Sequence, residues 1–319
     1  MTARLPSASG GRSSDDATAT AGLLVVNKPP GPTSHDVVAR VRRVTGIRKV
    51  GHTGTLDPFA QGVLPLLLGH ATRLAQFLMI AEKEYEADLR LGATTDTYDV
   101  TGRIAGPLTA ATVATWPGLP DVESAIATFR GTSFQEPPSF SAKKVLGTPS
   151  YRLARRDCPV RLAPVEVTVR ALNILSFAGD RLRLRVVCSA GFYVRSLAHA
   201  IGERLGTGAY LEGLTRTRSG EFTLADALSL ASLESDPATV PARTIPLNRL
   251  LSGLPALVLT AEGLLRAVRG NLIGPTHMVW PPSQDVGLNV RLLDQAGRLV
   301  AIAQPTGERG VLHPGVVLG

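Results

Sequence analysis

The sequence predicts an α+β protein with two folded parts. Polar and apolar residues alternate from Glu84 to Leu91, which is typical of a strand with one buried face. Thr33-Ser34 offers a helix N-cap, and valines at helical spacing follow it at 37, 38, 41 and 44. After about Ser252, short apolar segments recur at regular spacing, which favours a small β-barrel-like domain. We therefore expect a disordered tail at 1–21, a larger domain at 22–252 and a smaller one at 253–319.

The remaining elements follow from the same periodicities and from the turn residues between them. In the larger domain we expect strands at 23–26, 63–68 and 214–222, helices at 71–80, 122–130 and 151–156, loops at 94–99 and 106–120, a hairpin of strands 165–177 and 181–189, and a helix that opens at 191–195. In the smaller domain we expect strands at 256–259, 288–293, 299–303 and 311–318, with one or two helical turns at 262–268.

The composition excludes several classes of protein. The apolar fraction of 44% suits a globular chain, and no apolar run is long enough to cross a bilayer, so we expect no membrane association. Residues 1–21 are rich in Ser, Ala, Thr and Gly without a hydrophobic stretch, which indicates a disordered tail and not a signal peptide. Cys158 and Cys188 form no Cys-x-x-Cys pair, which favours a reducing cytoplasm and neither a metal knuckle nor a disulfide framework.

The positive charge of the chain is concentrated in one block. The net charge is +8, and the segment from Ser141 to Gly220 alone carries 14 Lys/Arg and 5 Asp/Glu, a net of +9. A localised basic surface favours a polyanionic partner, most simply a nucleic acid. The alternative is the solvated charged face of an ordinary enzyme.

The octapeptide Gly51-His52-Thr53-Gly54-Thr55-Leu56-Asp57-Pro58 is the strongest candidate for chemistry. Its glycines allow close approach of the backbone to a ligand, and Pro58 pushes Asp57 towards an extended conformation. This pattern is typical of a loop that aims a single acid. A Gly-rich turn in which Asp57 makes a local hydrogen bond is the competing interpretation.

Other familiar motifs are absent or incomplete. The chain has no phosphate-binding P-loop and no H-E-x-x-H zinc helix. Gly206-Thr207-Gly208 begins like a dinucleotide fingerprint, but Leu211 stands where the third glycine belongs. Gly51-His52-Thr53-Gly54 matches the GXXG loop of a KH domain, yet it ends in Asp57, which would repel phosphate.

Taken together, the motifs resemble those of the TruB family of tRNA pseudouridine synthases. Asn27-Lys28-Pro29-x-Gly31-x-Thr33-Ser34 and the octapeptide resemble its first two motifs, although many members carry Asp where this chain has Asn27. Further matches follow in the family's order: Glu82-Lys83-Glu84-Tyr85, Pro137-Pro138 with Ser141-Ala142-Lys143-Lys144, Gly191-Phe192-Tyr193-Val194-Arg195-Ser196-Leu197, and Leu214-Thr215-Arg216-Thr217-x-Ser219-Gly220. The resemblance covers about residues 22–319.

The resemblance implies isomerisation of uridine 55, in the T loop of tRNA, to pseudouridine. It implies a catalytic domain with a mainly antiparallel mixed sheet and flanking helices, followed by a small PUA RNA-binding domain. The partner would be the T stem-loop of tRNA, with no cofactor, no metal and no obligate protein partner. A monomer is the default expectation.

The chemistry suits four of the matched residues. The reaction breaks the C1′–N1 bond and joins C1′ to C5, so an ionised Asp57 can attack the sugar or stabilise its oxocarbenium character. Arg195 would pair with Asp57, and its alternative is a surface phosphate contact. Tyr85 would stack on the uracil, or else be an ordinary core aromatic. His52 would fill the gap left by the flipped base, or else bind the backbone.

The remaining candidates are less specific. Lys28 and Leu214 are expected at the substrate, and Lys143, Lys144, Arg216 and Arg218 at the RNA; the basic residues could instead shape the pocket or be solvated. Asp96 and Asp99 resemble a metal pair only loosely, and a local loop role is favoured. The competing hypotheses are a non-catalytic RNA-binding or remodelling protein, and a metal-dependent hydrolase that uses His52, Asp57, Asp96 and Asp99.

Overall fold

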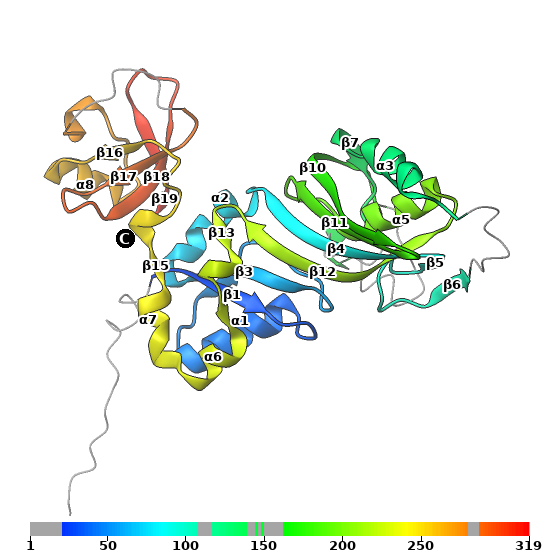
Figure 1. The fold of residues 1–319 in the computed structure, drawn as a ribbon. Coiled ribbons are helices and arrows are strands. Elements are labelled where there is room, and N and C mark those ends of the chain that lie inside the picture. The colour runs from blue at the N-terminus through cyan, green and yellow to red at the C-terminus, as the bar shows by residue number, and fades with distance from the viewer. Residues whose placement is uncertain are drawn as a thin grey trace, which may run out of the picture.

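The computed structural model describes residues 21–107, 116–138, 144–145, 148–149, 162–279 and 287–318, and it contains a large mixed sheet and a separate four-stranded sheet (Figure 1). The large sheet runs in the order β14-β1-β3-β12-β4-β11-β10-β7, while β2, β13 and β15 pair at its side. Its strands are β1 (Gly22–Lys28), β2 (Val50–His52), β3 (Gln61–Leu68), β4 (Lys83–Leu91), β7 (Gly131–Gln135), β10 (Val165–Ala178), β11 (Arg181–Cys188), β12 (Ala209–Ser219), β13 (Phe222–Thr223), β14 (Leu228–Ser229) and β15 (Ile245–Pro246).

Most neighbouring strands of the large sheet are antiparallel. The parallel pairs are β1 with β14 and β3 with β12, whereas β4 pairs antiparallel with both β11 and β12. The mainly antiparallel mixed sheet expected from the sequence is therefore confirmed. The predicted alternation of β4 is also observed, with Tyr85, Ala87, Leu89 and Leu91 buried on one face.

Both faces of the sheet are covered at β1 and β3, because alternate residues of these strands belong to two different core clusters. Leu24 and Leu64 belong to one core cluster, together with Tyr85 and residues of α1 (Ser34–Thr45), α3 (Leu119–Ala127) and α5 (Val194–Arg204). Leu23 and Val63 point to the opposite face, where they pack with Leu78 of α2 (Ala75–Met79) and with Leu299 of the second sheet. Because side chains alternate along a strand, one short apolar run supplies both cores.

The capping signals of α1 are confirmed. Thr33 is the N-cap and forms a capping box with Asp36, and Gly46 ends the helix with a left-handed φ of 72°. The helix buries Val37, Val38 and Val41 against the sheet, as their spacing predicts.

Several element boundaries differ from those expected. The segment 71–80 is a 3₁₀ turn (Gly69–Leu74) followed by α2, and α3 begins at Leu119 because Pro120 suits a first helical turn. The segments expected as loops contain β5 (Ala93–Thr95) and β6 (Ile104–Pro107), which pair with each other. β12 begins at Ala209, five residues early, because positive φ angles at Gly206 and Gly208 turn the chain back from α5 onto β4.

Other elements were not predicted from the sequence, and some predicted segments lie outside the described residues. No element was predicted between Phe222 and Ser252, where α6 (Leu230–Ser235) and α7 (Val240–Arg243) occur. Directly after Ser141-Ala142-Lys143, β8 (Lys144–Val145) and β9 (Thr148–Pro149) pair with each other. The expected tail at 1–20, the helix at 151–156 and Cys158 lie outside the described residues.

The smaller sheet has its own core. It consists of β16 (Ala256–Val258), β17 (Val290–Leu293), β18 (Leu299–Pro305) and β19 (Leu312–Val317), with α8 (Ala261–Ala267) beside it. Leu259, Ile273, Leu292 and Ala301 are buried in its core. The predicted strands and helical turn of this region are observed, whereas its identification as a PUA domain stays a prediction.

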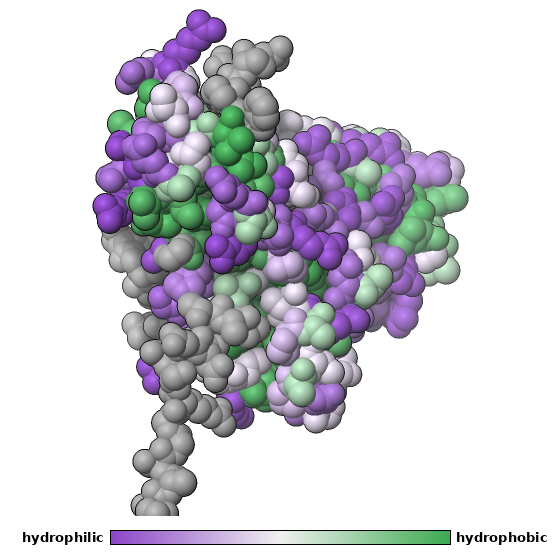
Figure 2. Space-filling model, turned by 90° about the vertical axis from the view of Figure 1, so that its left-hand side faces the viewer, coloured by the Kyte–Doolittle hydropathy of each residue, from purple (hydrophilic) through white to green (hydrophobic). Residues whose placement is uncertain are grey.

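The surface of the molecule is mixed in polarity. On the face shown in Figure 2, small hydrophobic patches are separated by hydrophilic residues. Within the described ranges, no helix is both long enough and apolar enough to span a bilayer.

Gly62 is expected to be intolerant of a side chain, because its φ is +110° and an added Cβ would lie 2.3 Å from the carbonyl oxygen of Arg216. Gly131, with φ +93° and no atom within 4 Å of an added Cβ, provides a control for backbone strain alone. We expect Gly131→Ala to lower the free energy of unfolding by about 1–2 kcal/mol and Gly62→Ala by about 3 kcal/mol or more. Urea denaturation of both variants measures the difference, and equal losses would contradict the close approach of β3 and β12.

Candidate active site around Asp57

The first residue of α1 holds the octapeptide in place. The hydroxyl of Ser34 accepts a hydrogen bond from the Leu56 amide at 2.9 Å and donates to the Leu56 carbonyl at 3.2 Å. The Leu56 side chain is buried in the core, and the Gly31 amide donates to the Pro58 carbonyl at 2.8 Å. The residues on both sides of Asp57 are therefore fixed to the N-terminal part of the chain.

Lys28 is buried beneath the octapeptide and does not face solvent. Its ammonium group donates to the carbonyls of Pro29, Pro58 and Ala60 at 3.0, 3.1 and 2.7 Å. Burial lowers the pKa of Lys28 to about 8, and the nearby Asp57 carboxylate opposes that shift. The expectation that Lys28 contacts substrate is corrected, because all three of its donor directions are taken by the backbone; it shapes the loop instead.

Arg216 holds the other half of the octapeptide. This side chain of β12 is 1% exposed and donates to the carbonyls of Val63 at 2.7 Å, Gly54 at 3.0 Å and Thr55 at 3.4 Å. It is therefore unavailable to RNA phosphates, and the prediction of RNA binding by Arg216 is corrected to a role in shaping the loop.

Asp57 and Arg195 form a bidentate ion pair. Arg195 Nη2 lies 3.1 Å from Asp57 Oδ1, and Nε lies 2.9 Å from Oδ2. The arginine side chain is 5% exposed and the aspartate side chain 31% exposed. The planar guanidinium thus fixes the carboxylate in orientation while an open side remains.

The start of α5, which carries Arg195, is clamped by β7. The Gln135 side chain accepts a hydrogen bond from the Tyr193 amide at 2.8 Å and donates to the Tyr193 carbonyl at 3.0 Å. Ser196 donates to the Glu136 carbonyl at 3.1 Å. Sequence analysis did not assign Gln135 a role, although it directly precedes the Pro137-Pro138 motif.

Asp99 is a second carboxylate on the same arginine, and sequence analysis missed this role. Its Oδ2 lies 3.3 Å from Arg195 Nη1, which also donates to the Thr97 carbonyl at 3.1 Å. Asp99 is buried, and its Oδ1 accepts hydrogen bonds from the Thr97 hydroxyl and the Thr101 amide. The only sequence feature that pointed to Asp99 was its place in a threonine-rich loop, and nothing in the sequence indicated that this loop contacts α5.

Asp57 experiences opposing influences on its pKa. Burial raises the pKa of the Asp57 carboxyl above its ordinary value, the Arg195 guanidinium lowers it, and the Asp99 carboxylate raises it further. The ion pair therefore determines whether Asp57 is charged near neutral pH.

Tyr85 lies on the buried face of β4, opposite Arg216 in the antiparallel register, and is 8% exposed. It belongs to the same core cluster as Leu214 of β12. Burial raises the pKa of the Tyr85 phenol, so the phenol stays neutral at physiological pH.

His52 forms a hydrogen bond with the backbone, as its alternative interpretation predicted. Its Nδ1 accepts a hydrogen bond from the Gly54 amide at 3.3 Å, and its ring meets His35 edge to face at 5.2 Å. Burial lowers the pKa of His52 to about 4, so the ring is neutral at pH 7.

Much of the basic block is neutralised within the sheet. Carboxylates of β4, of β12 and of Glu82 just before β4 pair with its arginines: Arg170 and Arg218 with Glu82, Arg185 with Glu84, Arg183 with Glu86, and Arg181 with Glu212. The inference of a broad free cationic surface is therefore corrected for these strands. Arg218 keeps a partly exposed side chain, Lys143 lies outside the described residues, and only the backbone of Lys144 is described.

The residues of the metal hypothesis do not converge. Asp96 is exposed and accepts a hydrogen bond from the Arg103 amide, whereas Asp99 is bound to Arg195. Across the described ranges, no three His, Cys, Asp or Glu side chains are grouped as metal ligands.

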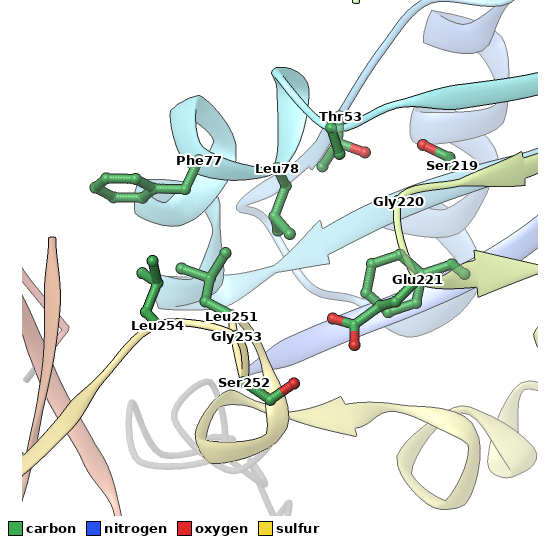
Figure 3. A pocket seen from close by; sticks show the side chains of 12 residues that line it. Thr53, Phe77, Leu78, Ser219, Gly220, Glu221, Leu251, Ser252, Gly253 and Leu254 are labelled. Carbon is green, nitrogen blue, oxygen red and sulfur yellow. The ribbon is translucent and has the colours of Figure 1, made fainter. Parts of the chain in front are cut away.

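A separate cavity of about 320 Å³ adjoins the octapeptide at Thr53 (Figure 3). Its walls come from α2, from the turn between β12 and β13, and from residues 251–254. Thr53 is the octapeptide residue in its lining, and neither Asp57, Tyr85 nor Arg195 contributes. This cavity is therefore distinct from the site at Asp57.

Comparisons with known proteins show which family the chain resembles over most of its length. Residues 42–194 match the family model described as TruB family pseudouridylate synthase (N terminal domain), and residues 195–258 match the one described as tRNA pseudouridylate synthase B C-terminal domain. The chain is 43% identical over 299 residues to tRNA pseudouridine synthase B of Solibacter usitatus, covering 93% of this chain and 99% of that protein. It is 41% identical over 288 residues to the protein of the same name from Geobacillus thermodenitrificans, covering 85% and 94%.

A solved structure is similar over nearly the whole chain. The structure of an H/ACA RNP bound to a substrate RNA containing 2′-deoxyuridine matches with a TM-score of 0.72 at 25% identity, covering 97% of this chain and 88% of that chain. The similarity extends through the smaller sheet as well as the large one.

Opposite shifts of the Asp57 pKa are expected from two variants. Asp99→Asn removes a carboxylate that raises this pKa and should lower it, whereas Arg195→Met removes a cation that lowers it and should raise it. Titration of ¹³C-labelled aspartate followed by NMR measures both, with the wild-type protein as reference. A shift of the same sign in both variants would contradict the shared ion pair.

Proposed function

The chain belongs to the TruB family of pseudouridylate synthases, and we propose that it converts uridine 55 in the T loop of tRNA to pseudouridine with Asp57 as the catalytic carboxylate. The names of its relatives support tRNA as the substrate. The bidentate pair of Asp57 with Arg195 is the observation that carries the assignment to Asp57. A protein that only binds RNA has no need of a partly exposed acid held in this way.

Asp57 acts at C1′ of the target ribose. The ionised carboxylate attacks C1′ or stabilises its positive charge as the C1′–N1 bond breaks, and the freed uracil turns and bonds through C5. The proton on C5 leaves and N1 gains one, so the reaction is an isomerisation with no net change in atoms. Only the ionised form of Asp57 serves, so activity falls as the pH drops through its raised pKa.

Arg195 and Asp99 keep the charges of the site balanced. Before reaction, Arg195 holds the negative charge of Asp57 in place. If Asp57 becomes bonded to C1′, its oxygen loses that charge, and Asp99 remains as the partner of the buried guanidinium. The arginine is therefore paired throughout the reaction.

We propose that Tyr85 and Leu214, which belong to one core cluster, form the apolar side of the site that receives the base. The raised pKa keeps Tyr85 protonated at neutral pH, so little phenolate is available to accept a proton, and stacking on the uracil is its proposed role. The neutral His52, on the partly exposed end of β2, is proposed to occupy the space that the flipped nucleotide leaves.

We propose that RNA contacts the parts of the surface where lysine and arginine side chains are exposed. Arg43, Arg48 and Lys49 are exposed at the end of α1 and in the segment that leads to the octapeptide, where they can bind phosphates. Arg218, Lys143 and Lys144 stay proposed RNA contacts, as does the small domain as a PUA domain. We also propose that the protein acts in the cytoplasm as a monomer without a protein partner.

Asp57→Asn is expected to abolish pseudouridine formation. The amide is nearly the same size but carries no charge and is a poor nucleophile, so the rate should fall by about 10⁴-fold or more, with tRNA affinity largely kept. Asp96→Asn, at an exposed carboxylate of a nearby loop, is the matched control and should keep wild-type activity. The measurement is pseudouridine mapping after incubation with unmodified tRNA; substantial turnover by Asp57→Asn would exclude its role.

The site of modification is expected to be uridine 55 alone. A tRNA transcript with cytidine at position 55 should gain no pseudouridine, whereas an isolated T stem-loop should be modified. Activity should be unchanged in EDTA, and its loss there would favour a metal-dependent reaction. Pseudouridine at any other position of the transcript would contradict the assignment to uridine 55.

A further inference from the structure

Tyr98 lies between the two loop residues that contact Arg195. The Thr97 carbonyl accepts a hydrogen bond from Arg195 Nη1 at 3.1 Å, and Asp99 Oδ2 lies 3.3 Å from the same nitrogen. The loop therefore reaches the arginine from both sides of Tyr98, and the backbone conformation at Tyr98 sets the relation between the two contacts.

The backbone of Tyr98 is strained. Its φ is +63°, a conformation that L side chains rarely adopt, and Leu251 is the other non-glycine residue with positive φ in the described ranges. The Tyr98 amide donates to the Thr95 carbonyl at 3.2 Å, and its carbonyl accepts from the Leu211 amide at 3.0 Å. A conformation of this kind persists only where its surroundings hold it.

The Tyr98 ring is stacked on His199. The ring centroids are 3.9 Å apart and the planes differ by 10°. His199 follows Arg195 by four residues on α5, so the two side chains lie on the same face of the helix, one turn apart. No described residue forms a hydrogen bond with His199 Nδ1, and its Nε2 is 3.4 Å from the exposed Glu203 carboxylate, so no hydrogen bond at Nδ1 competes with the stack for the orientation of this ring.

We propose that the Tyr98–His199 stack positions Arg195, and through it Asp57, for reaction. The loop and α5 are joined at two points one helical turn apart: by Thr97 and Asp99 at Arg195, and by Tyr98 at His199. The start of α5 is held separately by Gln135 of β7, so the two points fix the position and the rotation of the loop relative to that helix, whereas one point leaves the loop free to rotate. The inference rests on the proposed role of Asp57.

The geometry explains why a bulky residue occupies a position that suits glycine. Glycine at position 98 would remove the strain but also the second point of attachment. The loop would then turn about its contacts with Arg195, the guanidinium would follow Thr97 and Asp99, and its alignment with the Asp57 carboxylate would be lost. A displacement of about 1 Å at a reacting group can reduce a rate by about 10²-fold.

Four variants test the proposal: Tyr98→Gly, Tyr98→Phe, His199→Ala and the double variant Tyr98→Gly/His199→Ala. Leu251→Gly is the control, because it also relieves the strain of a positive φ, but at a residue outside the loop that contacts Arg195. The readouts are the single-turnover rate of pseudouridine formation with enzyme in excess, the Kd for tRNA and the melting temperature, with rates measured well below every melting transition.

We expect Tyr98→Gly and His199→Ala each to reduce the single-turnover rate by about 10- to 100-fold with the Kd for tRNA unchanged. The double variant should lose no more than either single variant, because both act through one contact. Tyr98→Phe, which keeps the ring, should stay within about twofold of the wild-type rate, as should Leu251→Gly.

Three results would overturn the proposal: an unchanged rate in Tyr98→Gly, additive losses in the double variant, or weaker tRNA binding with an unchanged rate. A wild-type protein that forms no pseudouridine would instead overturn the proposed function, so the two failures are distinguishable.

Discussion

The bidentate pair of Arg195 and Asp57 is the interaction on which the site depends. A buried guanidinium without a counter-charge costs several kcal/mol, and here two carboxylates and a carbonyl share its donors. The same contact opposes the effect of burial on Asp57, which would otherwise favour the neutral acid. The arginine is closed off from solvent while the aspartate is not, so substrate can reach one partner without separating the pair.

Buried cations also build the loop that presents Asp57. Lys28 of β1 donates to the Pro58 carbonyl and Arg216 of β12 to the Gly54 carbonyl, and charge-assisted hydrogen bonds of this kind are stronger than neutral ones. Ser34 adds a pair of neutral bonds at Leu56. A glycine-containing loop that would otherwise be flexible is thereby held in one conformation, which is what a reaction that depends on position requires.

Much of the fold could be predicted from local sequence patterns, whereas contacts between residues distant in the sequence could not. The alternation in β4 and the capping residues of α1 act over a few neighbours, so the sequence contains them directly. Asp57 and Arg195 were expected to meet only because the motifs resembled those of a known family. The burial of Lys28 and the contact of Asp99 with Arg195 depend on strands brought together from distant parts of the chain. The count of basic residues misled for the same reason, because the carboxylates of β4 that neutralise β11 lie about 100 positions earlier.

The charge ladder between β4 and β11 has a consequence for how a polyanion meets the protein. Glu84 and Glu86 pair diagonally with Arg185 and Arg183 across the two strands, so positive and negative groups alternate on this face of the sheet. The fields of such closely spaced opposite charges cancel within a few ångströms. These two strands therefore attract a nucleic acid less strongly than the number of their arginines alone would suggest.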